Sequence, residues 1–298
     1  IKTASCPGVT SENAGKASLC NGCPNQKLCS SGEAGFEDPS IDVVFDKLKH
    51  LKFILFVMSG KGGVGKSTIA CLLSHLLAEN KELNIGLLDT DICGPSQSRM
   101  TNTLGESVFQ SGDGWSPVFI DENLCTMSSS YLLDQIDKAI VWRGAKKTTL
   151  IKKFLADVDW NATDCLVIDT PPGTSDEHLT LVQLLSKLKE KVFTVIVTQP
   201  DVYSMDDVRR QLSFCRKTNL NILGIIENMA YFPCKSCGYH ANIWSEFENS
   251  IENFANEERV NFLGKCSFNT EIQKVCDKGL NDISLLKENM GDFCLIFD

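Results

Sequence analysis

Along most of the chain, short apolar runs alternate with longer segments in which apolar residues recur every three or four positions. The runs have the length of buried strands, and the longer segments have the period of amphipathic helices. Strands are predicted near residues 53–59, 84–90, 124–129, 164–170, 192–198, 221–227 and 260–264. Helices are predicted near residues 67–80, 146–156, 177–189, 204–217 and 271–279. This alternation predicts an α/β fold with a doubly wound, mostly parallel sheet that helices cover on both faces.

Two stretches depart from this pattern. The first thirty residues are polar, rich in glycine, asparagine and serine, and without either periodicity, and residues 30–45 are typical of a linker. The span 100–123, interrupted by glycines and a proline, is predicted to be an irregular excursion. We therefore predict a cysteine-rich extension with its linker over residues 1–45 and one α/β domain over residues 46–298.

The segment after the first predicted strand carries the Walker A pattern G-x-x-x-x-G-K-[ST]. Its glycines let backbone N–H groups wrap phosphates, Lys66 reaches the β- and γ-phosphates, and the Ser67 hydroxyl binds Mg²⁺. A helix follows directly, and its N-terminus favours anions. The residues predicted to bind ATP in this loop are Gly60, Lys61, Gly62, Gly63, Val64, Gly65, Lys66, Ser67 and Thr68.

The same glycines also fit the G-x-G-x-x-G turn of a dinucleotide-binding domain, with Asp89 where a ribose-binding acid is expected. Such a turn has no use for a phosphate lysine followed by a magnesium hydroxyl, so Lys66 and Ser67 favour a nucleoside triphosphate. Lys61 is a second lysine in the loop. On the loop alone, it also fits a solvated surface charge.

Two further predicted strands end in acidic residues, at the sheet edge where open α/β folds bind ligands. Asp169 is placed to hold the water shell of Mg²⁺, as a Walker B acid does. Asp91 could orient the attacking water, and Asp89 could support either task. Each of these acids could instead cap a helix or form a turn.

The loop with both lysines resembles the deviant Walker A, or MinD/ParA-like, class of ATPases, which includes the nitrogenase iron protein and the Mrp/Nbp iron–sulfur carriers. Residues 87–96 resemble its switch I, and residues 165–174 resemble its Walker B strand and switch II. The resemblance implies that Lys61 crosses a dimer interface to the partner's nucleotide. It also implies that Asn228 recognises the adenine base. Alternatively, Asn228 only forms a turn after the strand. The expected catalytic residues are Lys61, Lys66, Asp91 and Asp169.

Fourteen cysteines are many for an intracellular P-loop ATPase. Cys6, Cys20, Cys23 and Cys29 lie in the polar first thirty residues, which cannot fold around an apolar core, so a metal is the natural organiser. Four thiolates suit a structural zinc or a [4Fe–4S] cluster, and the spacing C-x₁₃-C-x₂-C-x₅-C leaves both open. Residues 6–8, 14–17 and 20–26 closely resemble the N-terminal extension of the larger nucleotide-binding scaffold of eukaryotic cytosolic iron–sulfur assembly. This resemblance implies a [4Fe–4S] cluster in the extension.

A second cysteine motif, Cys234 and Cys237, follows the strand predicted at 221–227. One C-x₂-C motif could be redox-active or half of a zinc site, and His240 is a possible third ligand or simply exposed. A twofold dimer would gather four thiolates, enough for one bridging [4Fe–4S] cluster, as the scaffold family also implies. The motif departs from the family because Pro233 precedes the first cysteine, where a proline between the two is expected.

The net charge of −9 gives neither a footprint for nucleic acid nor a polybasic patch for membranes, and no apolar run could span a bilayer. The resemblance implies a slow ATPase that assembles [4Fe–4S] clusters and transfers them to cytosolic and nuclear apoproteins. Its implied partners are a second copy or the smaller sibling scaffold in a heterotetramer, and late-acting assembly factors. The alternative is a reductase like the nitrogenase iron protein. A MinD-like positioning ATPase fits poorly, because residues 285–298 lack a basic amphipathic helix.

Overall fold

The computed structural model describes residues 12–13, 15–21, 26, 30, 38–112, 114–132, 144–234, 236–242, 244 and 250–279. The chain divides into two compact units, Ile1–Ile41 and Asp42–Asp298. Helix α2 (Ser40–Leu48) occupies part of the predicted linker, so the linker interpretation is wrong for residues 40–45. The helix forms because Val44 and Leu48 lie on one face and are completely buried in the core.

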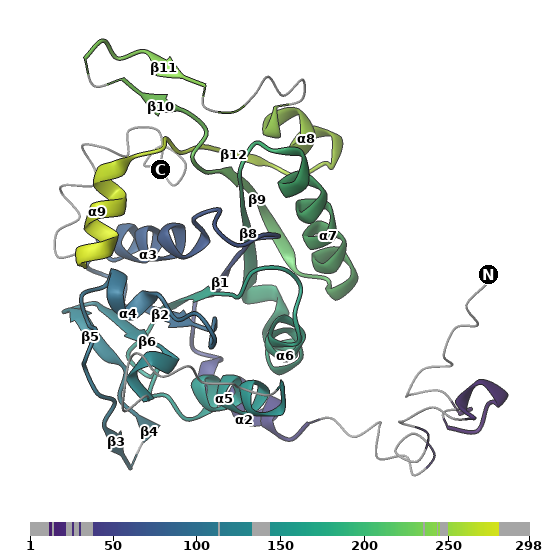
Figure 1. Ribbon diagram of the computed structural model, residues 1–298. Coiled ribbons are helices and arrows are strands. Elements are labelled where there is room, and N and C mark those ends of the chain that lie inside the picture. Colours follow the sequence, from purple (N-terminus) through teal and green to yellow (C-terminus); the bar gives the residue numbers. More distant parts are fainter. Residues whose placement is uncertain are drawn as a thin grey trace. The chain divides into compact units, whose positions relative to one another are not determined.

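An eight-stranded sheet forms the centre of the larger unit, with the strand order β12-β9-β8-β1-β7-β2-β6-β5 (Figure 1). Every pair is parallel except β5–β6. The doubly wound, mostly parallel sheet predicted from the sequence is therefore confirmed. The strands are β1 (Phe53–Met58), β2 (Ile85–Asp89), β5 (Val118–Asp121), β6 (Leu124–Met127), β7 (Cys165–Asp169), β8 (Val192–Thr198), β9 (Asn221–Glu227) and β12 (Phe262–Lys265).

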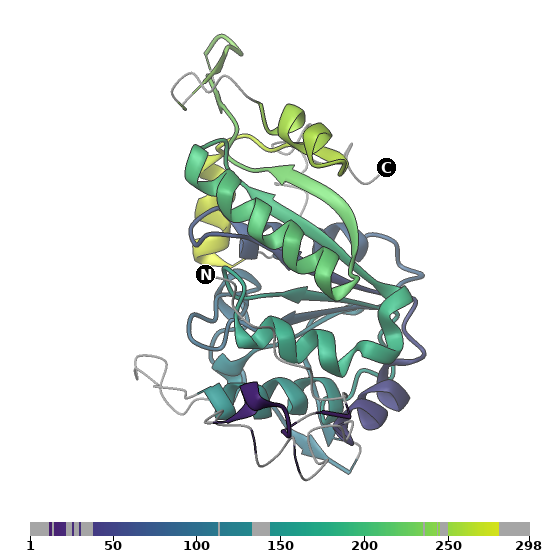
Figure 2. The same cartoon turned by 90° about the vertical axis from the view of Figure 1, so that its right-hand side faces the viewer.

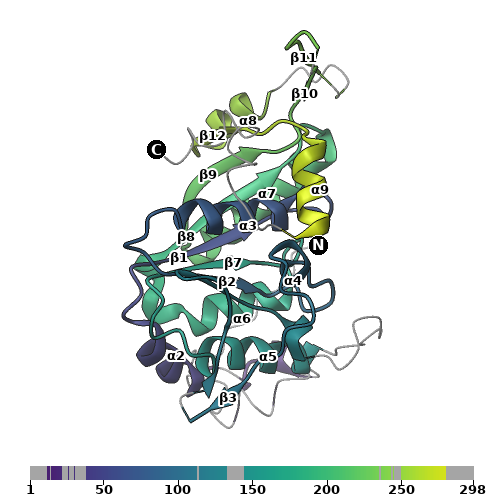
Figure 3. The ribbon, with the colours of Figure 1, turned by 90° about the vertical axis from the view of Figure 1, so that its left-hand side faces the viewer.

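Helices cover both faces of this sheet. Figure 2 looks onto the face covered by α6 and α7, and Figure 3 shows α3 and α9 on the opposite side. Side chains of β1 alternate between the two cores, with Phe56 in one and Val57 in the other, as the strand pleat requires. The helices are α3 (Lys66–Leu77), α4 (Gln97–Met100), α5 (Gly144–Ala156), α6 (Asp176–Leu184), α7 (Val202–Thr218), α8 (Ile251–Glu257) and α9 (Thr270–Lys278).

Two further expectations need correction, and one helix was not predicted. The span 100–123 is not wholly irregular, because it contains the hairpin of β3 (Gln110–Ser111) and β4 (Gly114–Trp115) and the edge strand β5. The helix predicted over 177–189 ends at Leu184. A separate 3₁₀ segment, Ser186–Lys191, follows it. Helix α8 was not predicted, although Ser250 caps it by accepting from the Asn253 backbone N–H. Within the described residues, no helix combines the length and the apolar character needed to cross a membrane.

Candidate functional site

The loop between β1 and α3 has the backbone of a phosphate-binding loop. Gly63 and Gly65 both have a φ of 84°, in the left-handed region that favours glycine. A Cβ on Gly65 would lie 2.1 Å from Nδ2 of Asn228, so this position also lacks room for a side chain. A Cβ on Gly62 or Gly63 would meet nothing within 4 Å, so the backbone there is open to an approaching ligand.

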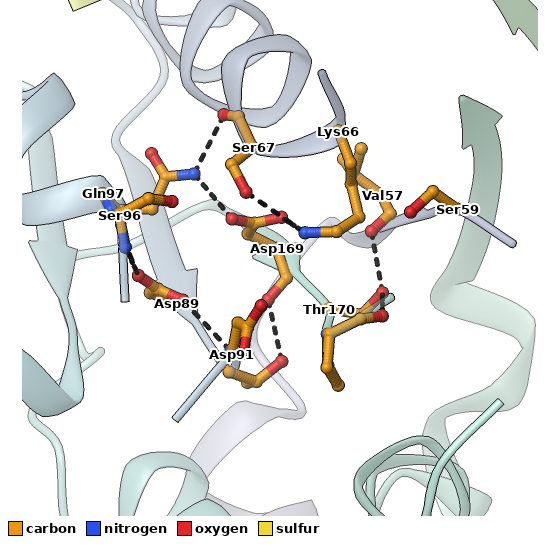
Figure 4. A network of polar contacts seen from close by, with 12 residues as sticks. Val57, Ser59, Lys66, Ser67, Asp89, Asp91, Ser96, Gln97, Asp169 and Thr170 are labelled. Atoms are coloured by element: carbon orange, nitrogen blue, oxygen red, sulfur yellow. Dashed lines mark hydrogen bonds and ion pairs between the residues drawn. The ribbon is translucent and has the colours of Figure 1, made fainter. Parts of the chain in front are cut away.

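A buried ion pair joins this loop to the end of β7 (Figure 4). Val57 of β1 is in register with Asp169 of β7, which places the loop beside the acid. The Lys66 ammonium donates to Asp169 Oδ1 and, at 3.2 Å, to Ser67 Oγ. The exposed fraction is 6% for the Lys66 side chain and zero for Asp169. The structure therefore brings together the three residues predicted to bind phosphate and magnesium.

Asp89 lies at the end of β2, in register with Asp169, and is completely buried. Burial, followed by the neighbouring charge of Asp169, raises the pKa of Asp89 to about 7. Four groups donate to its carboxylate: the backbone N–H groups of Asp91 (3.1 Å), Ser96 (3.0 Å) and Gln97 (3.1 Å), and the Ser128 hydroxyl (3.3 Å). Asp89 thus anchors the turn that follows β2, which is the segment predicted to be switch I.

Asp91 lies in that turn and is half-buried. Its Oδ1 accepts from the Gly94 backbone N–H at 3.2 Å, so it also forms the local turn that was its structural alternative. Burial raises its pKa, while the nearby Lys66 charge lowers it and Asp169 raises it. Asp91 is therefore close enough to the ion pair for both charges to change its pKa. Its role in orienting water stays a prediction.

Lys61 occupies a different environment from Lys66. Its side chain is 46% exposed, and its ammonium lies 3.8 Å from Asp201 Oδ1. The Asp201 carboxylate also caps α7 by accepting from the Ser204 backbone N–H at 2.9 Å. An exposed lysine in a loose ion pair can be withdrawn from it at little cost in free energy. The role of Lys61 across a dimer interface stays a prediction.

Asn228 lies directly after β9 and is buried beside the phosphate loop. Its Nδ2 donates to the Val64 carbonyl at 2.9 Å. The Asn228 side chain therefore holds the phosphate loop in place. The sequence did not suggest this structural role. Adenine recognition by Asn228 stays a prediction.

Gln97 was missed by the sequence analysis. It is completely buried at the start of α4, and its Nε2 donates to Asp169 Oδ2 at 2.8 Å and to the Ser67 carbonyl at 2.9 Å. A glutamine after a Gly-Pro-Ser turn matches no motif, and its partners are far away in the sequence. The one feature of the sequence that could have indicated Gln97 is its position, directly after the segment that begins at Asp89.

The described residues fit a nucleoside triphosphate with its magnesium ion. Lys66, Ser67 and Asp169 supply the ammonium, hydroxyl and carboxylate of a Walker site, and the open glycine backbone supplies N–H donors. A separate cavity of about 1030 Å³ lies between the end of α3 and β5, lined by residues such as His75, Thr103 and Phe119. It contains none of the predicted site residues, so we place the chemistry at the loop.

Cys234 and Cys237 lie in the hairpin of β10 (Phe232–Pro233) and β11 (His240–Ala241), which projects away from the sheet (Figure 1). Cys237 is exposed and Cys234 half-exposed. Backbone N–H groups of Ser236 and Cys237, and then the Cys237 thiol, lower the pKa of the Cys234 thiol. This environment favours the thiolate, the form that binds metals.

The possible third ligand, His240, stacks on the Tyr231 ring with centroids 4.2 Å apart. Among the residues that the structure describes, no group of three or more histidine, cysteine or acidic side chains could hold a metal ion. The hairpin of one chain therefore offers two thiols, half of the four that a [4Fe–4S] cluster takes, and a bridging cluster there stays a prediction.

Of the four cysteines predicted in the extension, the structure describes Cys20. It is buried at the end of the 3₁₀ segment Ser18–Cys20, where its backbone N–H donates to the Ala17 carbonyl at 2.8 Å. Cys6, Cys23 and Cys29 lie outside the described residues. The metal site of the extension stays a prediction.

A parallel sheet, a phosphate loop between its β1 and α3, and an acid at the end of the adjacent β7 define a P-loop nucleoside triphosphatase. Residues 50–291 match the family model of the NUBPL iron-transfer P-loop NTPases, within the ParA group. The chain belongs to this family, and its resemblance to the MinD/ParA-like class is confirmed.

Relatives with similar sequences carry related names. The chain is 47% identical over 274 residues to a cytosolic Fe-S cluster assembly factor NUBP1 homolog of Brugia malayi, covering 92% of this chain and 88% of the relative. It is 48% identical over 277 residues to the Nubp1 homolog of Drosophila melanogaster, with coverage of 92% and 89%.

Solved structures agree on the fold. A nucleotide-binding protein from Archaeoglobus fulgidus, in complex with ADP, superposes with a TM-score of 0.66 at 29% identity, over 80% of this chain and 90% of that one. The cell division ATPase MinD of Pyrococcus furiosus superposes with a TM-score of 0.56 at 18% identity, over 83% and 96%, and shows the fold alone.

Proposed function

We propose that this chain is an ATP-dependent scaffold that assembles [4Fe–4S] clusters and transfers them to apoproteins of the cytosol and nucleus. It works as a homodimer, or as a heterotetramer with the smaller sibling scaffold, and late-acting assembly factors receive or guide the cluster. Its hydrolysis is slow because each turnover accompanies one change of cluster state. The names of the relatives and the iron-transfer description of the family support this proposal.

The observation that carries the proposal is the position of the cysteine pair. Two thiols, one of them with a lowered pKa, lie on a projecting hairpin that continues from β9. A second copy related by a twofold axis would supply two more, and four thiolates complete a [4Fe–4S] site. Because Cys237 is exposed in the single chain, its thiol is accessible to a second chain and to incoming iron.

A short segment with several hydrogen bonds links this hairpin to the nucleotide site. At its start, Asn228 holds the carbonyl of Val64 in the phosphate loop. The Ala230 N–H then donates to the Cys266 carbonyl at 2.8 Å, and the Tyr231 carbonyl accepts from the Phe268 N–H at 2.7 Å. These bonds tie the segment to the chain that follows β12. Movement at the phosphate loop can therefore shift the base of the hairpin.

Nucleotide binding would rearrange the buried ion pair. ATP with Mg²⁺ supplies the phosphoryl group and the charge that activates its transfer. Lys66 would exchange Asp169 for the phosphates, which frees Asp169 and Ser67 for the magnesium shell. Asp91 would orient the attacking water, and Lys61 would leave Asp201 to reach the nucleotide of the partner.

A second cluster is proposed in the extension, held by Cys6, Cys20, Cys23 and Cys29. The reductase alternative shares the ATPase and the bridging cluster but must keep that cluster through redox cycles. The names of the relatives, which are cluster assembly factors, favour transfer over retention. A scaffold should lose its bridging cluster readily to apoprotein or chelator, whereas a reductase should keep it.

The test is anaerobic reconstitution with iron and sulfide, followed by Mössbauer spectroscopy and iron counting. Cys237→Ser should lose the shared cluster and keep the cluster of the extension, and Cys20→Ser with Cys23→Ser should show the reverse. Cys93→Ser, at another exposed cysteine, is the control and should keep all of the iron. Full iron retention in Cys237→Ser, or zinc as the bound metal after aerobic and anaerobic preparation alike, would contradict the proposal.

A further inference from the structure

Gln97 connects the two segments that any Walker site must hold together. Both hydrogens of its side-chain amide are used, one on Asp169 Oδ2 at 2.8 Å and one on the Ser67 carbonyl at 2.9 Å. Lys66 takes the other carboxylate oxygen, Oδ1 (Figure 4). Asp169 is thus held by two donors of different kinds, a charged ammonium and a neutral amide.

The orientation of this amide is fixed by its surroundings. Its Oε1 is buried without a partner among the described residues, an arrangement that lowers the stability of the folded chain. Turning the amide over would point Oε1 at a carboxylate and a carbonyl, and both are acceptors. The chain therefore leaves one acceptor unsatisfied to keep both donors on Asp169 and Ser67.

The backbone of Gln97 is held as firmly as its side chain. Its N–H donates to Asp89 Oδ2 at 3.1 Å, and its carbonyl accepts from the Thr101 N–H at 2.9 Å and the Thr101 hydroxyl at 2.8 Å. Asp89, at the end of β2, thereby places Gln97 against the acid at the end of β7. Because its backbone is already fixed, the Gln97 side chain loses little conformational entropy when it binds Asp169.

We propose that Gln97 is the positioning residue of Asp169 in the nucleotide-bound state. This inference rests on the nucleotide site proposed above. When phosphate draws Lys66 away, Oδ1 is released while Gln97 keeps Oδ2 bound. The carboxylate then keeps its orientation and presents Oδ1 beside Ser67, where the magnesium shell needs it. Because Gln97 directly follows the predicted switch I, it also transmits movement of that segment to Asp169.

The test compares the Kd of a fluorescent ADP analogue with Mg²⁺ and with EDTA. Gln97→Met keeps the length of the side chain but removes the donor, and Gln97→Leu removes the donor with a second, branched apolar side chain. Both variants should bind the metal-free nucleotide within about twofold of wild type. Both should lose about tenfold or more of the affinity gained with Mg²⁺, the usual effect of removing a residue that orients a metal-binding group.

Gln211 provides a matched control. It is another buried glutamine, with its Nε2 on the Ser59 carbonyl at 3.1 Å and its Oε1 without a described partner. Gln211→Met should keep the wild-type ratio of the two Kd values. Wild-type ratios in both Gln97 variants, or an equal loss in Gln211→Met, would overturn the role of Gln97. Absence of nucleotide binding by the wild-type chain would instead overturn the proposed function.

Discussion

The nucleotide site and the cysteine hairpin differ in how much of each site one chain completes. Lys66, at the start of α3, and Asp89 and Asp169, at the ends of β2 and β7, are buried and bound to groups of the same chain. At the hairpin, Cys234 and Cys237 are accessible, and in the proposed function each chain would supply half of a four-thiolate site. The buried part of the first region is preorganised by folding and would need a second chain only for Lys61, whereas the proposed cluster site of the second would need both another chain and a cluster.

This difference assigns different tasks to the two regions. Buried charges without water can stabilise charge in a transition state, because the donors are in place before the reaction. A cluster that must leave needs the opposite, a site with few contacts to break. Substitutions of the buried residues in the first region should therefore change the stability of the folded chain. Substitutions in the cysteine hairpin should change only the binding of the proposed cluster.

The largest effect on stability is expected for Asp169→Ala. It leaves the Lys66 ammonium buried and unpaired, which destabilises the nucleotide-free chain by about 3–5 kcal/mol. Urea unfolding measures the loss. The double variant Lys66→Met with Asp169→Leu should recover much of it, because an apolar pair leaves no buried charge. A loss below about 1 kcal/mol in the single variant would mean that the ion pair is open to water.

A smaller effect, dependent on pH, is expected at His178. Burial lowers the pKa of His178 to about 4, so protonation at acid pH favours the unfolded chain. The stability from the neutral ring is complete above pH 6.5 and is lost as the pH falls toward 4. Relative to His178→Asn, whose amide oxygen can still accept from the Ser175 N–H, wild type should lose about 2 kcal/mol between pH 7 and pH 5.

Unfolding of both proteins at pH 7 and pH 8 is the control for this experiment. The difference between them should be constant there, because the ring is neutral in both states. A difference that also stays constant from pH 7 to pH 5 would show that the buried ring does not resist protonation.

The sequence predicted the nucleotide region well because its signals are local. The glycine pattern with Lys66 and Ser67 is contiguous, and Asp169 ends an unbroken apolar strand. Parallel strands then bring these residues to one edge of the sheet without further information. Gln97 could not be found in this way, because its value depends on contacts 30 and 72 residues away along the chain.

The errors in the fold have equally specific causes. The sequence Asp38-Pro39-Ser40 suggested a linker, but the Asp38 carboxylate accepts from the Ser40 N–H at 3.0 Å at the start of α2. Strand β5 has only four residues, and its alternation of half-buried and exposed side chains is hidden between loops. Tertiary packing determines whether α2 and β5 form, and short sequence patterns carry no information about that packing.

Lys61→Ala changes an exposed residue of the nucleotide region and should separate stability from catalysis. The side chain is 46% exposed and its ion pair with Asp201 is loose, so unfolding should change by about 0–1 kcal/mol. If Lys61 serves the nucleotide of a partner, the variant should bind ATP and lose most hydrolysis, while Lys66→Ala should lose both. Lys81→Ala, which removes another exposed ion pair, with Asp121, is the control and should keep wild-type turnover. Wild-type turnover in Lys61→Ala would return Lys61 to a surface charge.

The smallest effect on stability, and the sharpest on function, is expected for Cys237→Ser. Because the side chain is exposed, unfolding of the metal-free chain should change by no more than about 0.5 kcal/mol. The shared cluster should nevertheless be lost, together with its effect on nucleotide binding. Coupling between two sites is reciprocal, so in wild type the bridging cluster should change the nucleotide Kd and nucleotide should change cluster lability. Nucleotide titrations of the apo and cluster-loaded forms of both proteins measure this. Equal Kd values for apo and loaded wild type would show two independent sites on one chain, and the bonds from Asn228 to the hairpin would then carry no signal.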